Sequence, residues 1–100
     1  MLSKKRRPTT PGEILRHEFL EPMGISQTQL AAALEITRVR VNDLIQGRRA
    51  VTTDTAVRLA RFFNTTVEFW LGLQMDVDIW DATQKHAALY KKIRPASAVV

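Results

Sequence analysis

The chain has 100 residues, enough for one domain with a modest core, and 45% of them are hydrophobic. It carries 15 Lys and Arg against 10 Asp and Glu, a formal net charge of +5, and residues 1–49 hold nine of these bases but five of the acids. The lack of cysteine excludes disulfides and thiolate chemistry, and no apolar run approaches the roughly 20 residues of a membrane span. The N-terminus lacks the apolar core of a signal peptide, so we expect a cytoplasmic protein.

Residues 1–9 form a basic arm whose sequence from residue 4 to 8 is Lys-Lys-Arg-Arg-Pro. The arm has little to bury, so we expect it to be mobile in the free protein. Two interpretations stay open: a solubilising tail, or an arm that touches phosphates or a minor groove.

A first helix is expected to begin after Thr10, which would cap it, with Pro11 at its first position and Glu13 completing a capping box. Pro22 and Gly24 are expected to end this helix. The residues expected on its buried face are Ile14, Leu15, Phe19 and Leu20.

Residues 26–47 predict two short helices joined by a tight turn. Ser26 and Gln29 form a second capping box, Thr37 is a further N-cap, and Gly47 closes the second helix. Two capped helices with so short a link must cross steeply over a shared core. This is the geometry of a helix-turn-helix, whose second helix can enter a DNA major groove. The alternative is an ordinary helical hairpin within an all-α bundle.

The second of these helices has distinct apolar and polar faces. If Val41, Leu44 and Ile45 face the core, a rotation of 100° per residue leaves four residues on the opposite face: Val39, Asn42, Asp43 and Gln46. Arg38 falls in the first turn and Arg40 on the flank. Arg can bind guanine, Asn or Gln adenine, Asp the amino group of cytosine, and Val a thymine methyl. The pattern therefore predicts a base-reading surface.

Arg48 and Arg49 directly follow this helix, where a chain leaving the groove would pass the sugar-phosphate backbone. We favour phosphate contacts for both, and a solvated loop is the alternative. The basic half of the chain is also the half with the helix-turn-helix, as an electrostatic footprint on DNA requires.

Two more helices are expected in the second half. Thr52 or Thr53 begins one that ends at Asn64, and Thr66 begins the next. The helix expected after Thr66 is apolar on more than one face, so it needs more than one surface to bury its side chains. A second copy of the chain is the favoured second surface, and a single large core is the alternative. The residues predicted at this dimer interface are Phe69, Leu73, Val77 and Trp80.

The sequence offers no Gly-rich phosphate loop and no spacing typical of a nucleophile and its base, so we expect no enzyme and no cofactor. Asp76, Asp78, Asp81 and His86 are the nearest approach to a metal cluster, and a solvated helix face is the preferred interpretation. We expect a domain over residues 10–91, with residues 92–100 as a frayed tail beyond the last periodic pattern.

The chain resembles the Xre/Cro-type helix-turn-helix proteins and, within them, the HigA-like (VapI-like) antitoxin branch. The resemblance runs from about Thr10 to Trp80. It is carried by four segments: residues 11–15, 26–47, 58–60 and 69–74, which read PGEIL, the helix-turn-helix unit, RLA and FWLGLQ. It implies an all-α, compact, lambda-repressor-like bundle of five or six helices that dimerises on palindromic operator DNA.

The resemblance also implies roles for single residues. Gln27 would meet a phosphate at the start of its helix. Arg38, Val39 and Asp43 would read bases, and Thr37 and Arg40 would contact the backbone or flank the bases. HigA-type proteins bind a HigB-type ribonuclease toxin and repress their own operon. The chain departs from the family at Glu35, which replaces a turn glycine, and in having no long acidic segment to wrap a basic toxin.

Three functions therefore compete. The first is a DNA-binding antitoxin that represses its own operon, and the second is a stand-alone regulator without a toxin. The third is a protein-interaction module that no longer binds DNA, and the basic bias of residues 1–49 argues against it.

Overall fold

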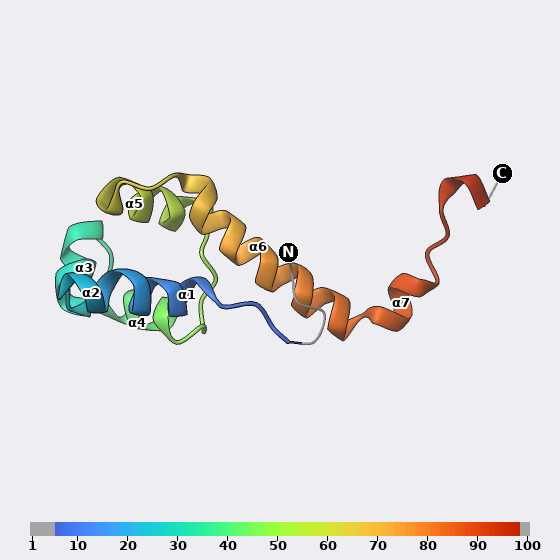
Figure 1. The fold of residues 1–100 in the computed structure, drawn as a ribbon, viewed down its shortest axis with the longest axis horizontal. Helices are drawn as coiled ribbons and strands as arrows, with labels where there is room; N and C mark the ends of the chain where they lie inside the picture. Colours follow the sequence, from blue (N-terminus) through green and yellow to red (C-terminus); the bar gives the residue numbers. More distant parts are fainter. Residues whose placement is uncertain (1–5, 99–100) are drawn as a thin grey trace.

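The computed structural model describes residues 6–98, which contain six helices and no strand (Figure 1). The first helix is continuous and has three parts: α1 (Pro11–Ile14), the π-helical stretch η1 (Leu15–Leu20) and α2 (Glu21–Met23). The others are α3 (Gln27–Leu34), α4 (Arg38–Ile45), α5 (Thr53–Phe63), α6 (Val67–Lys85) and α7 (Ala87–Lys91), followed by a short 3-10 turn, η2 (Ala96–Ala98). The predicted all-α class with a helix-turn-helix is confirmed.

The predicted helix starts are confirmed at every position. In each of five helices a Ser or Thr side chain accepts a hydrogen bond from the backbone N–H three residues further on. The caps are Thr10, Ser26, Thr37, Thr52 and Thr66. Asn64 ends α5 in the left-handed conformation, as expected, with φ +56°. Local hydrogen bonding therefore sets most of the helix boundaries.

The expectation that Pro22 helps to end the first helix is wrong, because the helix continues through Pro22 and ends at Gly24, with φ +65°. The preceding residues form wider π-type turns, in which the N–H of Glu21 donates to the carbonyl of Arg16, five residues back. In a regular α-helix a proline ring would meet the carbonyl four residues earlier. The change of helical pitch explains how the chain accommodates this proline.

The core is centred on Trp70, whose side chain is fully buried and whose indole Nε1 donates to Thr65 Oγ1 over 2.8 Å. Phe19 and Phe69 pack against the Trp70 ring with centroids 5.1 and 5.0 Å apart. Phe63 lies 4.8 Å from Phe19. This aromatic cluster joins the first helix to α5 and α6.

The molecule is longer than a compact chain of this size. Its extents are 56 × 24 × 24 Å, and its radius of gyration is 16.7 Å. A compact 100-residue domain has a radius of gyration of about 13 Å. The reason is visible in Figure 1, where the end of α6 and all of α7 extend away from the bundle of α1 to α5. Residues 92–98 of the predicted tail are exposed.

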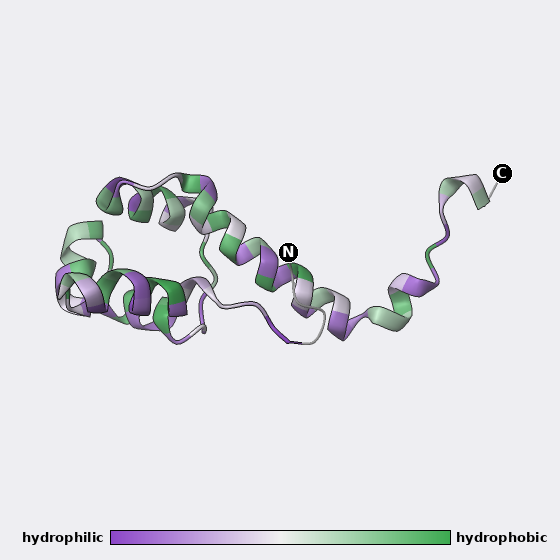
Figure 2. Cartoon of the chain, in the orientation of Figure 1, coloured by the Kyte–Doolittle hydropathy of each residue, from purple (hydrophilic) through white to green (hydrophobic). Residues whose placement is uncertain are grey.

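Hydrophobic residues continue along the extended part of α6 and into α7 (Figure 2). Met75, Ile79 and Leu89 are 57%, 45% and 57% exposed. None of the helices within residues 6–98 has the length and apolar character that a membrane span requires.

Candidate nucleic-acid interface

The position of α4 is fixed by contacts at both of its ends and by the packing of its buried face. Thr37 Oγ1 accepts from the N–H of Arg40 over 3.1 Å, and Gly47 follows the helix in the left-handed region at φ +76°. Val41, Leu44 and Ile45 are buried, as the spacing predicted. A helix held in this way can present its outer face in one fixed orientation.

The outer face of α4 consists of Arg38, Val39 and Gln46, which are all exposed, Val39 to 71%. Within residues 6–98, the Arg38 and Gln46 side chains make no hydrogen bond. Thr37 is also exposed, at the start of the helix. Arg38, Val39 and Gln46 are therefore available to a partner without the loss of a side-chain hydrogen bond between described residues.

Asn42 and Asp43 differ from the other residues predicted to read bases, because both are half-buried and already paired. Arg48 Nη2 donates to Asn42 Oδ1 over 2.8 Å, and Arg48 Nε donates to Asp43 Oδ1 over 3.1 Å. Asn42 Nδ2 in turn donates to Gln27 Oε1 over 3.1 Å. The structure therefore joins Gln27, Asn42, Asp43 and Arg48 in one hydrogen-bonded network, which we call the α3–α4 network.

Arg40 turns away from the outer face and toward α5. Its Nη2 donates to Thr55 Oγ1 over 2.7 Å and to Asp54 Oδ2 over 3.2 Å, while its Nε is buried without a partner among the described residues. A guanidinium held by these groups would have to leave them to meet DNA. The observed position of Arg40 therefore argues against the DNA contact that was predicted for it.

Asp54 joins two arginines at the first turn of α5. It also accepts from Arg58 Nε over 2.9 Å, and Arg58 Nη1 donates to the carbonyl of Leu34 at the end of α3. The hydrogen bonds from Arg58 and then from Arg40 hold the pKa of the Asp54 carboxyl below its ordinary value. Sequence reasoning missed this support of the helix-turn-helix, although Asp54 and Arg58 have the i, i+4 spacing of a helical ion pair.

The turn that Arg58 supports contains Glu35, which adopts the left-handed conformation with φ +56° and ψ +45°. Glu35 thus takes the left-handed position at this corner without the conformational freedom of a glycine. A non-glycine residue in this conformation costs about 1 kcal/mol.

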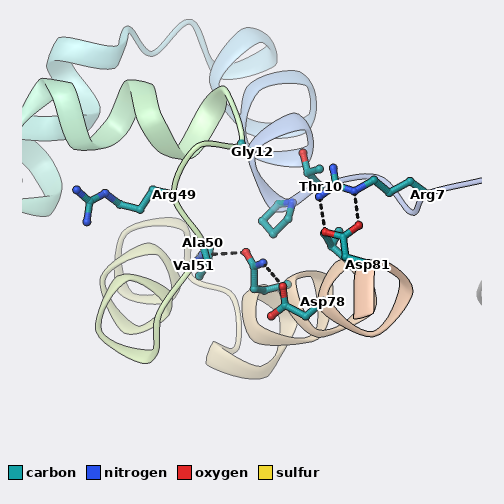
Figure 3. A pocket seen from close by; sticks show the side chains of 12 residues that line it. Arg7, Thr10, Gly12, Arg49, Ala50, Val51, Asp78 and Asp81 are labelled. Atoms are coloured by element: carbon teal, nitrogen blue, oxygen red, sulfur yellow. Dashed lines mark hydrogen bonds and ion pairs between the residues drawn. The ribbon is translucent and has the colours of Figure 1, made fainter. Parts of the chain in front are cut away.

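Arg49 and the N-terminal segment meet at a polar cavity of about 210 Å³ between α1, α6 and the loop after α4 (Figure 3). Arg7 makes a two-pronged ion pair with Asp81 of α6, with distances of 2.8 and 2.9 Å. This pair holds the pKa of Asp81 below its ordinary value. Arg49 is exposed and projects away from the pair. Residues 1–5 of the predicted arm lie outside the described residues.

The four predicted interface residues on α6 separate into two groups. Phe69 is 40% exposed, and Leu73 and Trp80 are half-buried; at 100° per residue these three lie within about 40° of one another. Val77 lies about 80° from Phe69 and is only 3% exposed. Because the chain already buries Val77, this residue has little surface left for a partner, and we remove it from the predicted interface.

No group of three or more His, Asp or Glu side chains within residues 6–98 is arranged to hold a metal ion. The surfaces that the described residues expose to a partner include the outer face of α4, the basic side chains around it and the exposed faces of α6 and α7.

Comparison with known proteins agrees with this geometry. The Helix-turn-helix family model matches residues 17–70. The chain is 48% identical over 81 residues to the uncharacterized HTH-type transcriptional regulator YbaQ of Escherichia coli K12, covering 81% of this chain and 72% of the relative. It is 42% identical over 95 residues to antitoxin HigA-1 of Vibrio cholerae, covering 95% and 90%.

A solved structure extends the comparison to the whole fold. The structure of Pseudomonas aeruginosa antitoxin HigA with the higBA promoter superimposes with a TM-score of 0.85 at 38% identity, covering 90% of this chain and 99% of that one. The matched model spans more than half of the chain, and the relatives are similar over most of their length. The chain belongs to the helix-turn-helix family and, within it, to the HigA-like branch.

Proposed function

We propose that the chain is a sequence-specific DNA-binding repressor and the antitoxin of a HigB/HigA-type pair, binding the operator of its own operon. The observation that carries this proposal is the outer face of α4, where Arg38, Val39 and Gln46 are exposed on a helix that caps and core contacts hold in place. The related HigA of P. aeruginosa was solved with its promoter, which supports the same use of the fold.

The proposed contacts fall into two classes. Arg38 and Val39 contact base edges near the start of α4, and Gln46 contacts a base edge at the other end of the helix. Thr37, Gln27, Arg48 and Arg49 contact phosphates, because hydroxyl, amide and guanidinium groups all donate to phosphate oxygens. Asn42 and Asp43 support Gln27 and Arg48 in the free protein, while Arg40 bonds to Asp54 and Thr55 of α5.

We propose that the chain acts as a homodimer. One recognition helix reads only a few base pairs, and a two-fold axis adds a second half-site about 34 Å away. The surface we assign to the dimer is the face of α6 with Phe69, Leu73 and Trp80, because aromatic side chains at the centre of an interface are the usual energetic anchors.

A protein partner is the second part of the proposed function. Membership in the HigA-like branch supports a HigB-type ribonuclease toxin as a protein partner, while the similarity to YbaQ, named as a transcriptional regulator, supports a stand-alone regulator as the second candidate. In either case the protein works where its operator lies, so we propose a cytoplasmic location. The proposal includes no catalytic activity.

DNA binding is tested by titrating a duplex from upstream of the chain's own gene at several salt concentrations. If about six phosphates are neutralised by the dimer, log K should fall against log salt with a slope of about −5. A slope near zero would exclude the electrostatic part of the proposal.

The two classes of contact are separated by Arg38→Ala and Arg48→Ala. Loss of a base-reading Arg38 should cost about 1–3 kcal/mol and relax the preference at one position in each half-site. Loss of Arg48 should weaken all sequences alike and reduce the salt slope by about one unit per site. Lys91→Ala, at the end of α7, removes the same charge far from α4 and is the matched control.

The antitoxin role is tested by co-expression with the product of the adjacent reading frame. If the chain is an antitoxin, it should co-purify with that product and restore the growth that the product alone arrests. A wild-type chain that binds its operator but neither retains the neighbouring product nor restores growth would favour the stand-alone regulator.

A further inference from the structure

We infer that Asn42 is a positioning residue that orients two phosphate-binding side chains, Gln27 and Arg48, and that it does not itself read a base. This inference rests on the proposed function, since it concerns how the same surface binds DNA. It also changes the role that the helical spacing alone assigns to Asn42.

The Asn42 carboxamide both accepts and donates a hydrogen bond within the chain. Its oxygen accepts from Arg48 over 2.8 Å, and its nitrogen donates to Gln27 over 3.1 Å. An Asn that recognises adenine presents a donor and an acceptor together to the base edge. Asn42 instead spans from α4 to the first residue of α3 and to the loop after α4, and it is half-buried between them.

The contact with Gln27 has a specific consequence for phosphate binding. Asn42 engages the Gln27 oxygen, which leaves both Gln27 amide hydrogens available to an acceptor. With the amide turned the other way, its oxygen would face the negative phosphate. Asn42 therefore selects the orientation in which Gln27 is a phosphate donor.

The contact with Arg48 acts in a similar way. Arg48 Nη2 is held by Asn42 and its Nε by Asp43, which fixes the plane of the guanidinium and leaves Nη1 without a partner among residues 6–98. A side chain that is already oriented loses less conformational freedom on binding. Arg48 also balances the negative charge of the Asp43 carboxylate, which would otherwise repel the phosphates that this surface approaches.

The Arg48–Asp43 ion pair of the α3–α4 network is expected to contribute little to the stability of the fold. The Arg48 side chain is 61% exposed, and ion pairs at such positions add little to the free energy of unfolding. The effect of Asn42 should therefore be measurable in DNA affinity rather than in the melting temperature.

The test measures the affinity of Asn42→Ala for the upstream duplex and for a scrambled duplex of the same length. We expect a loss of about five- to tenfold on both duplexes, an unchanged base preference in selection from a randomised library, and a melting temperature close to that of the wild type. In a Gln27→Ala/Arg48→Ala background, the same substitution should change affinity less than about twofold, because the side chains through which it acts are gone.

Asn42→Asp distinguishes positioning from base reading in a second way. An Asp at a base-reading position would favour cytosine in place of adenine, whereas at a positioning site the base preference stays the same. Two results would overturn the inference. One is a switch of base preference in Asn42→Asp. The other is an Asn42→Ala variant that loses base preference at a single position of each half-site. Unchanged affinity of Asn42→Ala on both duplexes would overturn it as well. If the wild-type chain binds neither duplex, the proposed function itself fails.

Discussion

Replacement of Gly12 by Ala should destabilise the fold strongly, because Gly12 lies where the start of α1 touches the end of α4. A Cβ atom at this position would overlap the carbonyl oxygen of Leu44 and lie 2.7 Å from that of Ile45. Both obstacles are backbone atoms of the recognition helix and its end, so no side-chain rotation can relieve them. Either α1 or α4 must move by on the order of 1 Å, and overpacking of a buried contact costs about 1–3 kcal/mol.

We expect Gly12→Ala to reach the upper end of that range, since two carbonyls are affected. A loss of about 3 kcal/mol corresponds to a decrease in melting temperature of about 12 °C or more for a domain of this size. The measurement is urea and thermal unfolding followed by circular dichroism.

Gly72→Ala is the matched control for this prediction. Gly72 lies inside α6, and a Cβ built there meets no atom within 4 Å. The same substitution should therefore stabilise the chain, by about 0.5–1 kcal/mol, since alanine is the better helix former. The reasoning is refuted if the free energy of unfolding of Gly12→Ala lies within about 0.5 kcal/mol of the wild-type value. In that case the close approach of α1 to α4 does not constrain the fold.

Three further predictions concern the turn, the ion pairs and the aromatic residues. Glu35→Gly should raise the free energy of unfolding by about 1 kcal/mol, because glycine adopts φ +56° without strain, and a destabilised variant in urea unfolding would contradict this. The pKa of Asp54 is lowered from 3.8 in the folded chain, so its ion pairs stabilise the fold above that pH and lose this effect as the pH falls through the folded pKa. Asp54→Asn should thus melt below the wild type at pH 6, with the difference shrinking below pH 4; a difference independent of pH from 6 to 2.5 would exclude ionisation as its cause. Trp70→Ala should cost about 3–5 kcal/mol and unfold the chain, whereas Trp80→Ala should stay folded and weaken the dimer by about 2 kcal/mol in sedimentation. A Trp80→Ala chain that stays fully dimeric at low micromolar concentration would remove the far end of α6 from the proposed interface.

The starts and ends of most helices could be predicted from the sequence, because the interactions that set them are local. Each Ser or Thr cap bonds to a backbone N–H three residues away, and Asn64 and Gly47 stop helices through their own backbone conformations. The buried face of α4 was also predictable from the 3.6-residue period of Val41, Leu44 and Ile45. These local signals are sufficient to identify a helix-turn-helix and the residues at its surface.

The tertiary structure decided which of those surface residues keep their side chains available. Arg40 and Asn42 both lie on α4 as predicted, but each also bonds to a neighbouring helix, α5 or α3, through a partner 14 or 15 residues away in sequence. Helical periodicity gives the direction in which a side chain leaves the helix and contains no information about a neighbouring helix that captures it. The same limit applies to Val77, which was predicted at the dimer interface and which the folded chain itself buries. It applies equally to Gly12, where only the approach of α1 to the carbonyls of α4 shows why a side chain is excluded.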